Sequence, residues 1–471
     1  MDVIIKIVQL VLSLGLLILL HEGGHYLFDK LFKTRVSKFY LFFDYKFHLF
    51  STYDKWFRKL LKKEPVPKKE NGEYEYQGTE YGIGWIPLGG YVAIEGMIDE
   101  TQSKDKLSAE PQPWEFRTKP AWQRLLIMLG GVIVNFVVAF FIYSMVLFTW
   151  GKDYVKTTDM TNGMKFSAQA KADGFQDGDI ILGVDDETFD YWNPSYHRNI
   201  ANGKVAHVLR EGTPLDINLP DDMNLLDMLE EPRYARELAP LCIDSIVPGS
   251  PAEKVGLRPG ILITAINGKP VNDFNDVQYA LFALQDGLTE ESTANDSLKR
   301  RTISLTLTDG DSVRTTKAEL NKDFTLGFVN AQPNYPITHI NYGFFESFPA
   351  GLAYGWNTLA GYVSDLKYVF TKKGARSMGG FIAIGNIFPG TWDWHSFWML
   401  TAFLSIILGF MNVLPIPALD GGHALFAIYE IITRRKPSDT FLQRAQYVGM
   451  FLLFGLLIFA NLNDILRLFG I

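Results

Sequence analysis

The stretch that decides the fold is residues 3–25, VIIKIVQLVLSLGLLILLHEGGH. Its apolar part, residues 3–20, contains one charge, and at 1.5 Å per residue it approaches the thickness of a hydrocarbon core of about 30 Å. A cleaved signal peptide would begin in a similar way, but no small-x-small cleavage site follows the run. The sequence therefore predicts a membrane helix that carries His21-Glu22-Gly23-Gly24-His25 at its end.

Three further runs have the length and composition of membrane helices, at residues 125–150, 396–419 and 445–463. The whole chain of 471 residues is 47% hydrophobic and 21% charged, with a mean hydropathy of +0.03. These values lie between those of a soluble enzyme and of a transporter that is membrane throughout. We therefore predict an integral membrane protein with four helical spans and substantial regions outside the bilayer.

The basic residues predict how the spans are oriented. Residues 26–124 are rich in Lys and Arg, and the link between the third and fourth runs contains Arg434, Arg435 and Lys436. By the positive-inside rule both connections are cytoplasmic, which places residues 151–395 and both termini on the other side. The net charge of −7 and the pI near 5.7 argue against a nucleic-acid partner.

The motif at residues 21–25 predicts a metal site. His21 and His25 are four residues apart, so one helix face presents both to a single zinc ion, and Glu22 stands beside them to take a proton from water. The single cysteine, Cys242, excludes a multi-cysteine site. The alternative is a pair of interfacial histidines with a solvated Glu22, but ionisable groups on a membrane helix are costly unless they bind something.

A zinc site needs a third protein ligand, and Asp420 is the candidate at the end of another apolar run. Pro415 and Pro417 must break the helix just before it and free backbone groups, which is tolerated at membrane depth only beside a protein cavity. Asp420 as a helix N-cap and His423 as the ligand are the alternatives.

Two segments between the second and third spans share one plan. Residues 166–190 and 243–280 each contain a small-residue helix, a glycine turn, an apolar strand and an Asp/Asn turn. They resemble a pair of PDZ domains, which implies that they capture peptides by strand addition. Gly178-Asp179 keeps the usual PDZ pair, whereas Gly260-Ile261 departs from it, and unrelated small β-rich domains are the alternative.

HEGGH together with SIILGFMNVLPIPALDGGH at residues 405–423 closely resembles the two motifs of the intramembrane site-2 zinc metalloproteases. The two PDZ-like modules make the chain similar to the bacterial regulator of sigma-E protease branch. The resemblance implies that His21, His25 and Asp420 bind Zn²⁺, that Glu22 activates water and that Asn412 hydrogen-bonds substrate. Asn412 as a plain helix–helix hydrogen bond is the alternative.

The resemblance also implies that residues 81–94, YGIGWIPLGGYVAI, form a membrane-dipping β element. Gly89, Gly90 and Tyr91 would then bind substrate in extended form along a free strand edge. A soluble hairpin on the cytoplasmic face is the alternative. Residues 51–77 are a charged insertion relative to the family, with the composition of an interfacial amphipathic helix or of a solvated loop.

The expected fold is a multi-pass α-helical membrane protein with four transmembrane helices, a membrane-associated β element and two extracytoplasmic PDZ-like α+β domains. The expected ranges are transmembrane helix 1 at 1–25, the cytoplasmic β region at 26–120, transmembrane helix 2 at 121–150, PDZ-like domains at 155–225 and 238–330, an interfacial helix and linker at 341–395, transmembrane helix 3 at 396–420, a cytoplasmic link at 421–444 and transmembrane helix 4 at 445–468.

The resemblance implies an intramembrane zinc endopeptidase of the bacterial inner membrane, with its active site toward the cytoplasm and its PDZ domains in the periplasm. Its partners would be membrane lipid, single-pass membrane substrates such as anti-sigma factors and remnant signal peptides, and peptide termini at the PDZ domains. The sigma-E stress response would be its setting. A non-catalytic membrane scaffold that presents two PDZ modules is the alternative, and the intact Glu22 argues against it.

Overall fold

The computed structural model describes residues 2–67, 74–87, 89–97, 110–193, 195–286 and 294–469. The chain forms two compact units, one made of Met1–Gly151 and Asn341–Ile471 and the other of Lys152–Ile340. Three parts of the predicted regions lie outside the described residues: Leu88 of the β element, residues 68–73 of the charged insertion and residues 98–109 of the cytoplasmic region.

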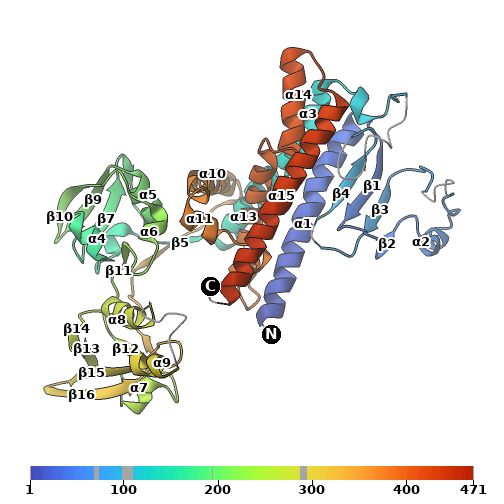
Figure 1. The fold of residues 1–471 in the computed structure, drawn as a ribbon. Coiled ribbons are helices and arrows are strands. Elements are labelled where there is room, and N and C mark those ends of the chain that lie inside the picture. The colour runs from blue at the N-terminus through green and yellow to red at the C-terminus, as the bar shows by residue number, and fades with distance from the viewer. Residues whose placement is uncertain are drawn as a thin grey trace. The chain divides into compact units, whose positions relative to one another are not determined.

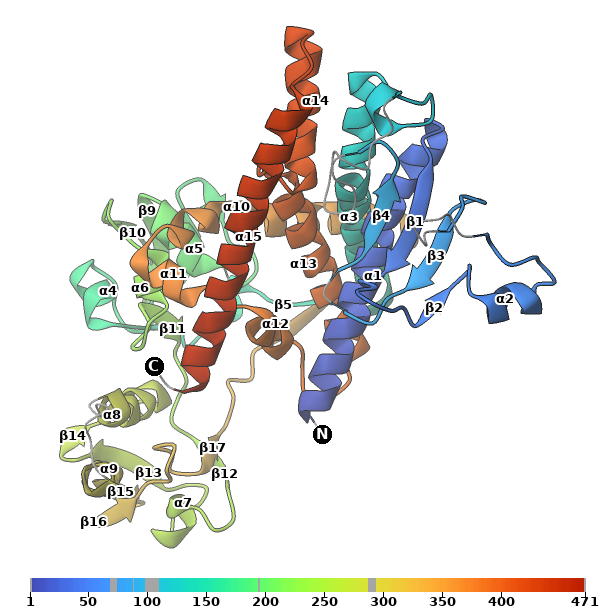
Figure 2. The same cartoon turned by 45° about the vertical axis from the view of Figure 1, so that its right-hand side comes forward.

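Four helices of the first unit are long and apolar enough to cross a membrane: α1 Asp2–Leu31, α3 Ala121–Trp150, α13 Trp394–Val413 and α15 Asp439–Leu468. Their number agrees with the four spans predicted from the sequence. Helix α3 is the central one, because α1, α13, α10 (Phe344–Val369) and α14 (Asp420–Thr433) all pack against it. Figures 1 and 2 show this unit from two directions.

The ends of these helices follow from local chemistry. Helix α13 ends at Val413 because Pro415 has no N–H to continue the ladder, and Leu414 before it takes an extended conformation. The chain then runs through residues 414–419 and starts α14 at Asp420. Gly151 ends α3 with a φ of 63°, a conformation that glycine adopts without strain.

A four-stranded sheet lies beside α1, with the strand order β2-β3-β1-β4 (Figures 1 and 2). The strands are β1 Val36–Leu41, β2 Phe50–Ser51, β3 Glu80–Ile83 and β4 Tyr91–Ile94. β1 pairs parallel with β3 and antiparallel with β4, so β4 is an edge strand. Val36, Val92 and Ile94 pack against Ile127 and Met128 of α3, which seats the sheet on the helices.

The rest of this unit consists of short helices and one long one. They are α2 Lys55–Leu60, η2 Phe116–Thr118, α11 Lys372–Ser377 and α12 Phe381–Ile387, in addition to α10. Glycines let α10 approach α3 closely, since a Cβ on Gly351 would lie 2.3 Å from Ser144 Oγ. Arg124 of α3 and Glu430 of α14 form an ion pair of 2.6 Å that joins these two helices.

The second unit repeats one arrangement in its two halves. Each half has a four-stranded antiparallel sheet, β10-β9-β7-β8 or β14-β13-β15-β16, and a separate antiparallel pair, β11-β6 or β12-β17. Each half also has its own apolar core, built around Phe166, Phe175 and Ile181 in the first and Ile263, Leu305 and Leu307 in the second. The repeated plan expected from the sequence is therefore present as two similar β-rich bodies.

The elements of the first half are β5 Lys152–Val155, η3 Thr157–Asp159, β6 Met164–Phe166, α4 Ala168–Ala172, β7 Ile180–Val184, β8 Glu187–Thr188, α5 Tyr196–Asn202, β9 Val205–Arg210, β10 Thr213–Asn218, α6 Leu225–Met228 and β11 Ala235–Glu237. Those of the second are β12 Ile243–Ile246, α7 Pro251–Lys254, β13 Leu262–Ile266, β14 Lys269–Pro270, α8 Phe274–Asp286, α9 Ala294–Arg301, β15 Thr302–Asp309, β16 Ser312–Glu319, β17 Phe328–Asn330 and β18 Ile337–Ile340. β18 pairs with β5, so the chain enters and leaves this unit side by side.

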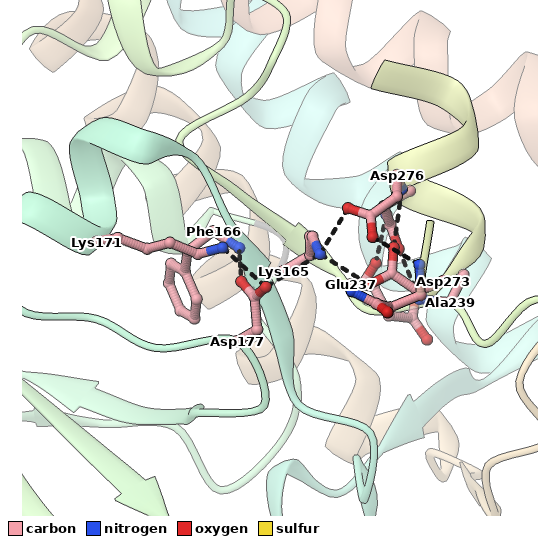
Figure 3. Close-up of polar contacts among 10 residues, drawn as sticks. Lys165, Phe166, Lys171, Asp177, Glu237, Ala239, Asp273 and Asp276 are labelled. Atoms are coloured by element: carbon pink, nitrogen blue, oxygen red, sulfur yellow. Dashed lines mark hydrogen bonds and ion pairs between the residues drawn. The ribbon is translucent and has the colours of Figure 1, made fainter. Parts of the chain in front are cut away.

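Lys165 of β6 joins the two halves through a cluster of carboxylates (Figure 3). Its Nζ lies 3.0 Å from Asp177 Oδ2 in the first half, and 2.8 Å from both Asp273 Oδ2 and Asp276 Oδ1 at the start of α8. Burial disfavours the charged ammonium, but the hydrogen bonds to Asp273, Asp276 and Asp177 raise the pKa of Lys165 above its ordinary value. One buried cation thus balances carboxylates from both halves.

We expect Lys165→Met to loosen the junction between the halves, because it leaves Asp273 and Asp276 facing each other without this cation and leaves Asp177 paired with Lys171. Breaking such a buried pair costs about 3 kcal/mol. This loss corresponds to roughly a hundredfold faster hydrogen exchange of the backbone amides that the cluster protects. Hydrogen exchange of the full chain, read over β6 and the first turn of α8, checks this. Lys204→Met, which removes an exposed lysine, is the control, and unchanged exchange in the Lys165 variant would contradict the role of the cluster.

Candidate metal centre

Three side chains from two distant parts of the sequence converge on one point. His21 Nε2 and His25 Nε2 lie 3.3 Å apart, and Asp420 Oδ2 lies 3.2 Å from the first and 3.3 Å from the second. Among the described residues, these three form the one group of histidine, cysteine and carboxylate side chains whose ligand atoms could share a metal ion. Asp420 Oδ2 is buried and makes no hydrogen bond with the described residues.

The spacing of these atoms fits a tetrahedral zinc ion. Two ligand atoms that lie about 2.0–2.1 Å from a tetrahedral zinc are about 3.3 Å from each other. The three measured separations, 3.2 to 3.3 Å, agree with one face of such a tetrahedron. The three side chains are 13%, 8% and 21% exposed, so little water competes for their donor atoms.

The second ring nitrogen of His25 is also engaged. Its Nδ1 lies 2.8 Å from the carbonyl oxygen of Ile127, which can accept a hydrogen only from a protonated Nδ1. That contact selects the tautomer whose Nε2 is free to bind a metal, which is the usual arrangement around metal-ligating histidines.

Glu22 lies in a cavity beside the three ligand atoms. The cavity is lined by all three of them and by residues of β4, of the segment after α13 and of α15, including Gly90, Tyr91, Val92, Leu419 and Gln446. The backbone of Val92 hydrogen-bonds the Glu22 carboxylate. The acid is therefore held next to the ligand set, and the edge strand β4 forms one wall of the same cavity.

The predicted substrate strand is placed in part at this cavity. Gly90 and Tyr91 line it, whereas Gly89 packs against the ring of Phe43. A Cβ on Gly90 would lie 2.7 Å from both Ile18 Cγ2 and Tyr40 O, so only glycine lets the strand pass this close to α1. In the described residues β4 pairs with β1 alone, which leaves its other edge without a strand partner.

Asn412 is also brought to the site, with its Nδ2 3.2 Å from His21 Nε2. His423 lines the cavity but hydrogen-bonds Gln446 and does not belong to the ligand group. Helix α14 begins at Asp420, but its N-cap is Leu419 and no described side chain caps it, so Asp420 is not the N-cap that the alternative required. The Asp420 carboxylate points to the two histidines.

Sequence reasoning did not identify the part that Gly131 plays. A Cβ on Gly131 would lie 2.6 Å from both His21 Cε1 and His25 Nε2, so the bare backbone of α3 is what leaves room for the two imidazoles. The same crossing brings Gly24 of α1 against Gly130, where an added Cβ would lie 2.3 Å from a carbonyl oxygen. The paired glycines inside an apolar run were the available signal.

We expect Gly131→Ala to disturb the metal site, because the added methyl group must displace an imidazole or separate α1 from α3. Zinc affinity of the purified full chain, measured by competition with a chelator, should fall at least tenfold, in the range seen when ligand orientation is lost. Gly455→Ala in α15, where an added Cβ would meet nothing within 4 Å, is the matched control. Equal zinc affinity in both variants would contradict this packing argument.

Comparison with known proteins shows the family of this chain. The family model described as peptidase family M50 matches residues 72–456, which include Asn412 and Asp420. The "Putative zinc metalloprotease" of Vibrio cholerae is 25% identical over 495 residues, covering 99% of this chain and 100% of that protein. Metalloprotease MmpA of Caulobacter vibrioides is 25% identical over 477 residues, covering 98% of this chain and 96% of that protein. The family model matches well over half of the chain, so this chain belongs to peptidase family M50.

Proposed function

We propose that this protein is an intramembrane zinc endopeptidase of the site-2 protease type, which hydrolyses a peptide bond within or beside a substrate's transmembrane segment. The observation that carries the proposal is the convergence of His21, His25 and Asp420 beside Glu22, on helices long and apolar enough to cross a membrane. A buried carboxylate and two imidazoles in such surroundings are costly unless they bind a cation.

In this proposal His21 Nε2, His25 Nε2 and Asp420 Oδ2 hold the zinc ion, and their mutual distances support that assignment. When bound, zinc would polarise the scissile carbonyl and lower the pKa of a water molecule toward neutrality. The names of the Vibrio cholerae and Caulobacter vibrioides relatives agree with a metalloprotease.

Glu22 acts as the general base and then as the general acid. Its carboxylate lies in the cavity with the ligand atoms and is oriented by the backbone of Val92. It accepts a proton from the attacking water and returns that proton to the leaving amine. Asn412 has its amide nitrogen beside His21, where an N–H donor can stabilise the oxyanion that develops on the scissile carbonyl.

The edge strand β4 holds the substrate in extended form. A peptide bond inside a helix is shielded by its own hydrogen bonds, so a protease that acts on membrane helices must first unwind them. Support comes from the unpaired edge of β4 and from its position on the wall of the cavity that contains Glu22. The predicted contact residues are Gly89, Gly90 and Tyr91, of which Gly90 and Tyr91 line this cavity and Gly89 lies close to the ring of Phe43.

The two halves of the second unit are assigned as PDZ-like modules on the extracytoplasmic side of a bacterial inner membrane. The repeated strand plan supports the first assignment, and the Lys and Arg distribution supports the second. They would admit substrates whose external domains have been trimmed. By resemblance, these substrates are anti-sigma factors and remnant signal peptides, as in the sigma-E response.

A non-catalytic scaffold with a structural zinc is the second candidate. It needs His21, His25 and Asp420 but gives no reason for a carboxylic acid beside them in the same cavity. Glu22 therefore separates the two candidates.

We expect Glu22→Gln to bind zinc as the wild type does and to lose cleavage of a single-span model substrate by about 10²–10⁴-fold, because the amide cannot take up the proton. Asp420→Asn is the comparison, since it should lose both zinc and cleavage. Zinc content and cleavage of each purified full-length variant in lipid nanodiscs provide the measurement. Full cleavage by Glu22→Gln would contradict the mechanism, and zinc binding without cleavage by the wild type would favour the scaffold.

A further inference from the structure

Asn135 of α3 is a fully buried amide at the metal centre to which the mechanism assigns no role. Its side chain is 0% exposed and its Nδ2 lies 3.1 Å from Nδ1 of His21. Its Oδ1 is buried and has no hydrogen-bond partner among the described residues. An amide in an apolar helix with one unsatisfied end costs free energy, so its retention points to a specific contact.

The contact is with the ring nitrogen that does not face the metal. If Nε2 of a neutral His21 binds zinc, the ring proton must sit on Nδ1, and Nδ1 then donates a hydrogen bond. An amide N–H cannot accept that hydrogen, but the amide oxygen can. Nitrogen and oxygen of an asparagine exchange places by a half turn of the amide, and the hydrogen-bond pattern decides between the two orientations. In either orientation, one end of the Asn135 amide lacks a hydrogen-bond partner in the described part of the chain, so that end does not distinguish the two orientations. The Nδ1 hydrogen of His21 does, because only Oδ1 can accept it, and it therefore selects the orientation with Oδ1 toward His21.

Asn135 is also the place where three membrane helices meet. Ser405 of α13 donates a hydrogen bond of 2.7 Å to the backbone carbonyl of Asn135. A Cβ on Gly409, one turn further along α13, would lie 3.3 Å from Asn135 Cβ, so this helix passes directly over the residue. The same face of α13 then continues to Asn412, which contacts His21.

We infer that Asn135 is a positioning residue of this site: its side-chain oxygen accepts the Nδ1 hydrogen of His21 and so presents Nε2 to zinc. Helix α3 then orients both histidines from behind, His25 through the carbonyl of Ile127 and His21 through Asn135. The inference rests on the proposed function, because it presupposes that the two Nε2 atoms bind zinc. The alternative is a purely structural hydrogen bond between α1 and α3.

Three variants of the full-length protein test this inference by zinc affinity, measured in nanodiscs by competition with a chelator. Asn135→Leu keeps the approximate volume but accepts no hydrogen bond, and it should weaken zinc binding about 10–100-fold, as loss of an outer-shell partner does. Asn135→Asp keeps an acceptor, and it should bind zinc as tightly as the wild type or more tightly. Ser13→Ala is the matched control: Ser13 is buried in α1 and bonded at 3.0 Å to Thr401, and its loss removes an interhelical hydrogen bond away from His21.

A second readout separates orientation of the ligand from folding. The thermal midpoints of the metal-free proteins should fall comparably in Asn135→Leu and Ser13→Ala, whereas zinc affinity should fall in the first alone. Wild-type zinc affinity in Asn135→Leu would overturn the inference, as would failure of Asn135→Asp to restore binding, or an equal loss of affinity in Ser13→Ala. Absence of zinc binding by the wild type would overturn the proposed function and this inference together, so the two failures are distinguishable.

Discussion

The close contact between α1 and α3 is the constraint on which the membrane unit depends. Gly24, Gly130 and Gly131 have no side chains, so the two helix backbones approach to a distance that any Cβ would prevent. In an apolar solvent helices gain little from hydrophobic burial against each other, and small residues that allow close packing take over that role. The two imidazoles occupy the space that Gly131 leaves. The close packing of α1 against α3 therefore also sets the positions of the two histidines.

Several polar groups of this unit form hydrogen bonds between its helices. Ser13 meets Thr401, Ser405 meets the backbone of Asn135, and Asn135 meets His21. Each of these hydrogen bonds joins two different membrane helices. An unsatisfied polar group inside a bilayer is expensive, so such bonds fix the register of the helices more firmly than apolar contacts would. The non-helical segment at residues 414–419 follows α13 and brings Asp420 to His21 and His25.

The second unit is organised by a different kind of interaction. Its halves have separate apolar cores, and the buried ammonium of Lys165 links them through three carboxylates. Asn275 adds two hydrogen bonds to the strand that connects the halves, one with the backbone of Glu237 and one with that of Ala239. A charge cluster of this kind is directional, and it therefore sets one orientation of the halves where an apolar contact would allow several.

The sequence by itself determined the four apolar spans, the proline break before Asp420 and the repeated plan of the second unit, because hydropathy, helix breaking and strand patterning act over short stretches of chain. It also determined the chemistry of the candidate site, since His21, Glu22 and His25 are adjacent on one helical turn. Only the tertiary structure decided that Gly131 makes room for both rings, that Asn135 stands behind His21 and that β4 borders the same cavity as Glu22. Residues far apart in the sequence form these contacts, and tertiary packing, which no local pattern encodes, brings them together.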